Sequence, residues 1–299
     1  MSLDHALSQS GLFERLLERS ESLPLGNRAA LMRIASMCSD PGVDAHEVAL
    51  EAARDEELAA QLLRIANSAY SASVSPISDL RTAVSRLGLR LVQSLAVAAP
   101  TLRLLAGPND GLGWARQALH QHAVRAGLAA RMISPLDVHP DQALTAGLIQ
   151  NLGLNVISLC EPTLFGRILE LASRGVELSL LEEAELGFTH GELGARLAER
   201  WSYPPALSTS ILEHDAQVPS TALGAVVHVA DRLVRESGAG IEPQAEPSPV
   251  ALQLARVGDL DAARGRLQML LDAQARLEAR QDRELAANAG LLDGLSATG

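Results

Sequence analysis

Apolar residues recur every three or four positions along most of this chain, and this spacing constrains the fold more than any other feature. Over residues 58–70 the recurring residues are Leu58, Leu62, Ile65 and Ala69. Such spacing places the apolar side chains on one face of a helix. No segment shows the sustained alternation of apolar and polar residues that a half-buried strand requires. The sequence therefore predicts an all-α fold.

Clusters of glycine and proline divide the predicted helices into four regions. Residues 1–107 hold five or six short helices that would form an N-terminal lobe, and a second helical block follows over 112–237. Residues 238–258 are rich in Pro and Gly and are predicted to form a linker. Residues 259–299 are a predicted C-terminal helical extension that Asp259 can cap, with a leucine stripe too brief for an isolated coiled coil.

The charge and composition of the chain exclude several classes of function. The net charge of −11 argues against a general nucleic-acid binder or a protein of anionic membrane surfaces. Cys38 and Cys160 lie far apart in the sequence, which excludes a disulfide scaffold and a thiolate zinc site. There is no signal-peptide pattern, and the best membrane candidate, Leu91–Gly107, is short and interrupted by polar residues. We expect a soluble, cytoplasmic protein.

Four titratable residues of the second block lie on or beside apolar faces of separate predicted helices. They are His122, His190, His214 and Asp231. Such residues can converge inside a helical bundle, as metal ligands do. Taken one at a time, they are more often buried hydrogen-bonding groups than ligands. They are therefore candidates for a shared pocket.

Several sequence motifs between residues 63 and 204 occur in an order that is typical of one known family. The first is LRIANSAY over 63–70, and the last begins with ELGFTHGELGA over 185–195. The motif residues that we single out are Asn67, Ser68, Trp201 and Pro204. Together these stretches resemble the HDOD (HD-related output domain) family over roughly residues 20–235. The resemblance implies an N-terminal helical lobe packed on an HD-like helical bundle.

A third motif departs from the catalytic relatives of that family. The sequence GLIQNLG over 147–153 resembles the GLLHDIG signature of HD-superfamily phosphohydrolases, with Gln150 and Asn151 in place of the His–Asp pair. In catalytic HD proteins a His, this pair and a late Asp hold divalent metal. By resemblance, His122 corresponds to the first His and Asp231 to the late Asp.

The remaining two histidines match a second set of ligands. His190 and His214 lie where the cyclic-dinucleotide phosphodiesterase branch carries extra metal-binding histidines, and this chain has Asp215 where that branch has a further His. Gln150 and Asn151 are neutral amides and weak ligands for zinc, iron or manganese. We therefore expect no catalytic residue, no metal and no cofactor, with the histidines kept in a vestigial pocket.

These observations predict a non-catalytic regulatory module of bacterial two-component or cyclic-dinucleotide signalling. It would act through contacts with signalling proteins, such as a histidine kinase, a response regulator or a cyclic-dinucleotide enzyme. Two alternatives stay open. One is a metal-dependent phosphohydrolase or phosphodiesterase that uses the remaining histidines, and the other is a sensor that binds a nucleotide without turnover. The sequence does not indicate the oligomeric state.

Overall fold

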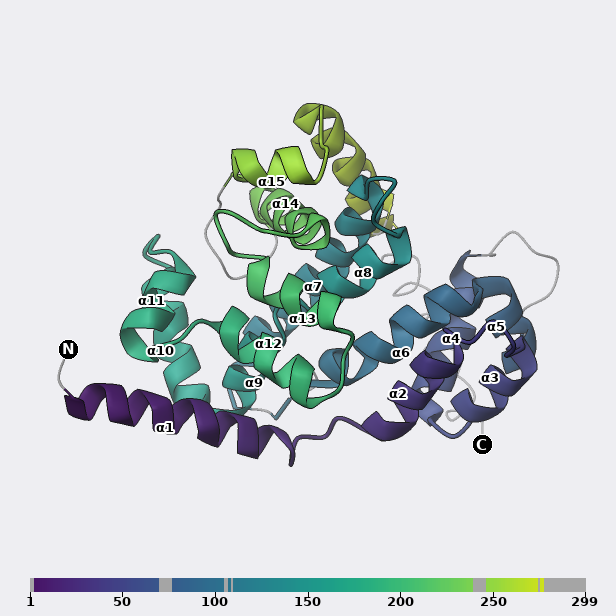
Figure 1. The fold of residues 1–299 in the computed structure, drawn as a ribbon, viewed down its shortest axis with the longest axis horizontal. Helices are drawn as coiled ribbons and strands as arrows, with labels where there is room; N and C mark the ends of the chain where they lie inside the picture. The colour runs from purple at the N-terminus through teal and green to yellow at the C-terminus, as the bar shows by residue number, and fades with distance from the viewer. Residues whose placement is uncertain are drawn as a thin grey trace, which may run out of the picture. The chain divides into compact units, whose positions relative to one another are not determined.

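A computed structural model describes residues 3–69, 77–104, 107–108, 110–238, 246–273 and 275–276, with side chains from Gly11 onward except those of Ser68 and Ala69. Within these residues the secondary structure is helical and contains no strand, so the predicted all-α fold is confirmed (Figure 1). The helices are α1 (Leu3–Ser20), α2 (Arg28–Met37), α3 (Ala45–Ala52), α4 (Glu56–Ala69), α5 (Leu80–Leu87), α6 (Leu89–Arg103), α7 (Gly113–Ile133), α8 (Pro140–Ile149), α9 (Leu152–Cys160), α10 (Pro162–Ala172), α11 (Leu178–Glu185), α12 (His190–Arg200), α13 (Pro205–Glu213), α14 (Ala222–Glu236) and α15 (Pro249–Leu254).

Helices α2 to α6 form the N-terminal lobe, in which α2 packs on α6 and α5 packs on both α3 and α4. Local caps fix where these helices begin. Asp44 and Glu47 form a capping box at the start of α3. Leu58 and Leu62 of the predicted apolar stripe are fully buried and Ile65 is half-buried, so the helical spacing of apolar residues identified this part of the core correctly.

Helix α1 packs on the second block, against α9 and α12, although the sequence analysis placed it in the N-terminal lobe (Figure 1). The ring of Phe13 on α1 meets the ring of Phe188 edge to face, with 4.9 Å between their centroids. Leu16 and Leu17 are buried in the same helix. Helical spacing shows that α1 has an apolar face, but it does not show which block covers that face.

The second block is built around α7, which packs on α8 and α14, and around α12, which packs on α9 and α13. The N-terminal lobe meets this block where α6 packs on α8. The Ser94 hydroxyl on α6 donates a hydrogen bond to the carbonyl oxygen of Asp141 on α8, at 2.9 Å. A cavity of about 270 Å³ lies at this junction and is also lined by Pro204 and Leu207 at the start of α13.

The chain separates into two compact units, Met1–Arg256 and Val257–Gly299. In the first unit, α15 lies inside the range 238–258, so the prediction of a linker throughout that range is wrong. Ser248 caps α15 by accepting a hydrogen bond from the backbone amide of Ala251, and proline occupies the first turn, where it favours a helix. Residues 239–245 of the predicted linker lie outside the described residues.

In the second unit, residues 260–273 are helical. The Asp259 carboxylate accepts a hydrogen bond from the backbone amide of Ala262 at 2.8 Å, which is the cap expected from the sequence. The part of the predicted extension that follows residue 276 lies outside the described residues.

Among the described residues, one stretch, Pro140–Cys160, is long and apolar enough to cross a membrane by length and composition, and 94% of its apolar 18-residue window is buried inside the fold. It consists of two helices, α8 and α9, with Gln150 and Asn151 between them. Helices that form the core of a soluble protein pass the same test, so this stretch is weak evidence for a membrane span.

Candidate functional site

The first group of predicted site residues comes together where α7, the α8–α9 junction and α14 meet. His122 Nε2 lies 2.8 Å from Asp231 Oδ1, and the amide nitrogen of Gln150 lies 3.0 Å from each of these two atoms. All three side chains are buried. We call His122, Gln150 and Asp231 the Gln150 cluster.

The position of Gln150 follows from hydrogen-bond chemistry. An ionised carboxylate only accepts hydrogen bonds, so the amide NH₂ of Gln150 faces Asp231 and donates to it. The neighbouring Asn151 is also buried but does not join this cluster, and within the described part of the chain its side-chain amide has no hydrogen-bond partner. Gln150 therefore donates to Asp231, and its amide nitrogen also lies beside His122 Nε2.

The Gln150 cluster does not fit the metal centre of catalytic HD proteins. That centre takes an imidazole and an anionic carboxylate from the two positions that Gln150 and Asn151 occupy here. A metal ion needs lone pairs from its ligands, whereas Gln150 donates an N–H group to Asp231 Oδ1 and so occupies a lone pair that a metal ion would need. The residues of this cluster therefore do not supply the ligands of a catalytic metal.

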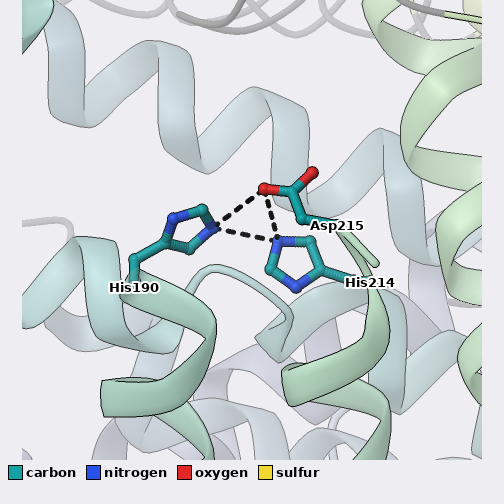
Figure 2. A group of neighbouring side chains, drawn as sticks. All are labelled: His190, His214 and Asp215. Carbon is teal, nitrogen blue, oxygen red and sulfur yellow. Dashed lines mark hydrogen bonds and ion pairs between the residues drawn. The ribbon is translucent and has the colours of Figure 1, made fainter. Parts of the chain in front are cut away.

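The other predicted histidines form a second group at the start of α12 and the end of α13 (Figure 2). The Nε2 atoms of His190 and His214 lie 3.0 Å apart. Asp215 Oδ2 lies 3.6 Å from the first of these atoms and 3.8 Å from the second. We call His190, His214 and Asp215 the histidine cluster.

Each histidine of this cluster is held through its other ring nitrogen. His190 Nδ1 lies 2.7 Å from Glu182 Oε2, which also accepts a hydrogen bond from the His190 backbone amide at 2.9 Å. His214 Nδ1 lies 2.7 Å from the carbonyl oxygen of Ile211. Burial lowers the pKa of His214 to about 4, because Asp215 only partly offsets the loss of solvation. His214 is therefore neutral at pH 7.

Of two buried arginines on α14, Arg235 connects the two clusters and Arg232 contacts the histidine cluster. Asp215 Oδ1 accepts hydrogen bonds from Arg232 at 3.0 Å and from Arg235 at 2.8 Å, and Arg235 Nε lies 2.6 Å from Asp231 Oδ2. Burial alone would raise the pKa of Asp215 and of Asp231, but Arg235 and the surrounding cations hold both well below their usual range. Both carboxylates are therefore ionised across the physiological pH range.

The family-motif residues lie away from these clusters and hold the fold together. Trp201 is buried at the end of α12, where its ring packs on Tyr203 and the Arg28 guanidinium lies 5.2 Å from the ring centroid. Pro204 is the N-cap residue of α13. The side chain of Ser68 lies outside the described residues.

Asn67 fastens α4 to the segment that leads into α5. Its side-chain oxygen accepts a hydrogen bond from the Ile77 amide at 2.8 Å, and its amide nitrogen donates to the carbonyl oxygens of Ile77 and Leu63, both at 2.9 Å. Ile77 is buried against Ala66 and Ala83. Three hydrogen bonds from one side chain thus fix the entry of Ile77 into the lobe core.

We expect the substitution Asn67→Ala to lower the free energy of unfolding by about 2 to 3 kcal/mol, because three hydrogen bonds are lost and the freed backbone groups are half-buried. Urea denaturation measures this loss. Gln142→Ala on the exposed face of α8 is the control and should change stability by less than about 0.5 kcal/mol. An Asn67→Ala variant as stable as wild type would contradict the role assigned to this side chain.

Sequence reasoning missed three residues that position the two clusters. Arg235 follows Asp231 by four residues, a spacing at which opposite charges pair on a helix, so this contact had a readable signal. Glu182 had no such signal in the sequence, because it belongs to α11 and reaches His190 only through the tertiary fold. Arg232 contacts Asp215 across an interval of 17 residues and likewise follows from packing alone.

Comparison with known proteins places the chain in a family. Residues 27–217 match the HDOD domain. An uncharacterized protein of Treponema pallidum is 30% identical over 192 residues, which make up 62% of this chain and 36% of that protein. The chain thus spans about a third of the length of this relative.

Solved structures agree with this assignment. An HDOD domain protein of unknown function from Geobacter sulfurreducens is 25% identical, with a TM-score of 0.67 over 87% of this chain and 94% of that one. A "Putative signal transduction protein" from Marinobacter aquaeolei is 22% identical, with a TM-score of 0.67 over 93% of this chain and 66% of that one, and it shows the fold alone. This chain belongs to the HDOD domain family.

Proposed function

We propose that this chain is a non-catalytic regulatory module of bacterial signal transduction, located in the cytoplasm, that acts by binding other signalling proteins. The partner classes that fit this role are a histidine kinase, a response regulator or a cyclic-dinucleotide enzyme. The structural neighbour from Marinobacter aquaeolei carries a signal-transduction name, which is in line with this role.

The observation that carries the proposal is the amide of Gln150, which lies 3.0 Å from both His122 Nε2 and Asp231 Oδ1. A hydrolase of the HD type needs an anionic bridging ligand and a water activated by metal at this place. Here a neutral side chain donates hydrogen bonds to Asp231 and lies 3.0 Å from His122 Nε2. Asp231 is thus paired with protein groups, and the cluster is buried in the core.

The junction between α6 and α8 is the place where a partner would act. The two lobes meet there around the cavity described above, which exposed Arg90 and half-buried Gln93 line from the α6 side. A protein that binds across this junction contacts both lobes and can favour one packing of the lobes over another. Binding at the junction would in this way change the output of the module without chemistry.

The test measures turnover and partner binding on the same preparation of full-length protein. We expect no hydrolysis of a generic phosphoester or of cyclic dinucleotides above the protein-free blank when Mn²⁺, Fe²⁺ or Zn²⁺ is added. A partner captured from the native cell and then purified should slow hydrogen exchange in α6 and at the start of α8. The substitution Arg90→Glu should weaken its binding, and Arg167→Glu on the exposed side of α10 should not.

Two outcomes would contradict the proposal. One is metal-dependent hydrolysis that disappears in an Asp231→Asn variant, which would support the phosphohydrolase alternative. The other is exchange protection in α6 and α8 that stays unchanged when the partner binds. A rise in melting temperature with a nucleotide, without hydrolysis, would instead support the nucleotide sensor.

A further inference from the structure

The two imidazoles of the histidine cluster point their Nε2 atoms at each other, and their partners fix the position of each ring proton. Glu182 Oε2 accepts from the His190 backbone amide, so it is an acceptor for His190 Nδ1 as well. The carbonyl oxygen of Ile211 can only accept from His214 Nδ1. When both rings are neutral, the hydrogen of each therefore resides on Nδ1, and Nε2 carries a lone pair.

Two nitrogen lone pairs at 3.0 Å repel each other unless a proton or a metal ion lies between them. The surrounding charges favour a cation as well. Glu182, Asp215 and Asp231 bring three carboxylates to this region, and Arg232 and Arg235 bring two guanidinium groups. With neutral histidines, one negative charge remains in a region that is largely removed from solvent.

The spacing of the three ligand atoms fits a small metal ion. All three atoms lie within 4.8 Å of one another, with separations of 3.0, 3.6 and 3.8 Å. A point equidistant from the three atoms therefore lies about 2.0 Å from each of them. This distance is close to the Zn–N and Zn–O bond lengths of about 2.0 to 2.2 Å. In Figure 2 the two ring nitrogens and the carboxylate oxygen converge on this point from α12 and from the end of α13.

The contacts around these three residues are those of a prepared metal site. Metal-binding histidines commonly donate their second ring N–H to a carboxylate or a backbone carbonyl, which orients the ring. Glu182 and the Ile211 carbonyl occupy these two places here. Arg232 and Arg235 both hold Asp215 Oδ1 and leave Oδ2 directed at the histidines.

We propose that His190, His214 and Asp215 bind a divalent first-row transition-metal ion of the zinc, cobalt or iron(II) type. Two imidazole nitrogens and one carboxylate oxygen are a donor set for this class of ion. The bound ion would join the start of α12 to the end of α13 and, through Asp215 and its arginines, to α14. This site is separate from the Gln150 cluster, and the inference goes beyond the proposed function because it requires no turnover.

The experiment titrates the chelator-treated, full-length chain with Co²⁺ and then with Zn²⁺. We expect one equivalent of Co²⁺ to bind with the visible absorption of a protein-bound ion, Zn²⁺ to displace it, and the melting temperature to rise with Zn²⁺. His190→Gln and His214→Gln should each weaken Co²⁺ binding strongly. The loss should exceed the roughly 10- to 100-fold weakening that is typical when a residue hydrogen-bonded to a metal ligand is removed. His122→Gln, which removes a buried histidine of the other cluster, should leave Co²⁺ binding unchanged.

A milder variant covers the case in which the ligand variants do not fold. Glu182→Gln keeps the size of the side chain and should weaken Co²⁺ binding by roughly 10- to 100-fold. In wild-type protein, the ¹⁵N resonances of both Nε2 atoms should move when Zn²⁺ is added.

Three results would overturn the metal site. They are no Co²⁺ uptake by wild-type protein, uptake that survives in His190→Gln and His214→Gln, and Nε2 resonances that show a shared proton and do not respond to Zn²⁺. Hydrolysis by the metal-loaded chain would contradict the proposed function and leave the metal site standing, so the two proposals fail separately.

Discussion

The substitution Gly153→Ala is expected to lower the free energy of unfolding by about 3 kcal/mol or more. A Cβ atom at this position would lie 2.0 Å from the carbonyl oxygen of His190 and 2.8 Å from the backbone nitrogen of Gly194. Both neighbours are backbone atoms of α12, so no side-chain rotation can relieve the clash. Helix α12 would have to move away from α9, and His190 would move with it.

Thermal and urea denaturation measure this loss, and Gly166→Ala provides the matched control. Gly166 lies inside α10, where a new Cβ atom would meet only a Leu112 methyl group, at 3.8 Å. Because alanine favours a helix more than glycine does, this control should gain up to about 1 kcal/mol. A Gly153→Ala variant as stable as Gly166→Ala would show that α9 and α12 are not in the close contact described here.

Gly153 also shows how far the sequence predicts this molecule. A glycine after Gln150 and Asn151 indicates helix punctuation, and the spacing of apolar residues places helices on both sides of it. The sequence does not show that this glycine faces Gly194, 41 positions later, because that contact depends on how α9 and α12 pack. The same limit applies to α1, whose apolar face was readable and whose neighbours α9 and α12 were not.

The candidate site likewise contains contacts that the sequence indicated and contacts that it did not. The resemblance brought His122, Gln150 and Asp231 to one place, and the structure puts their side-chain atoms within 3.0 Å of one another. It also grouped His190 with His214. It did not indicate that Asp215 completes the second group, because a carboxylate at that position departs from the motif and its arginine partners come from another helix.

A second large effect on stability is expected when one of these arginines, Arg235, is replaced. The substitution Arg235→Met should lower the free energy of unfolding at pH 7 by about 3 to 5 kcal/mol, because it leaves buried carboxylates without their main counter-charge. Arg235 contacts both Asp231 and Asp215, and its side chain is only 1% exposed. Methionine keeps most of the hydrocarbon packing, so the loss reports on charge more than on volume.

The pH dependence separates this electrostatic effect from a packing defect. Arg235 lowers the pKa of Asp231 and Asp215 in the folded protein, so both groups stabilise the fold above their unfolded pKa of about 4. This contribution falls away as the pH drops below that value and the unfolded chain takes up protons. The stability gap between wild type and Arg235→Met should therefore be widest at neutral pH and should narrow as the pH falls below about 4.

Urea denaturation of both proteins from neutral to acidic pH gives this gap directly. Arg196→Met is the control, because Arg196 pairs with Glu199 on the exposed side of α12 and such pairs contribute less than about 1 kcal/mol. A gap that stays constant across the pH range would assign the loss to packing. A gap below about 1 kcal/mol at pH 7 would mean that Arg235 does not neutralise the two carboxylates, and the electrostatic connection between the Gln150 cluster and the histidine cluster would then be wrong.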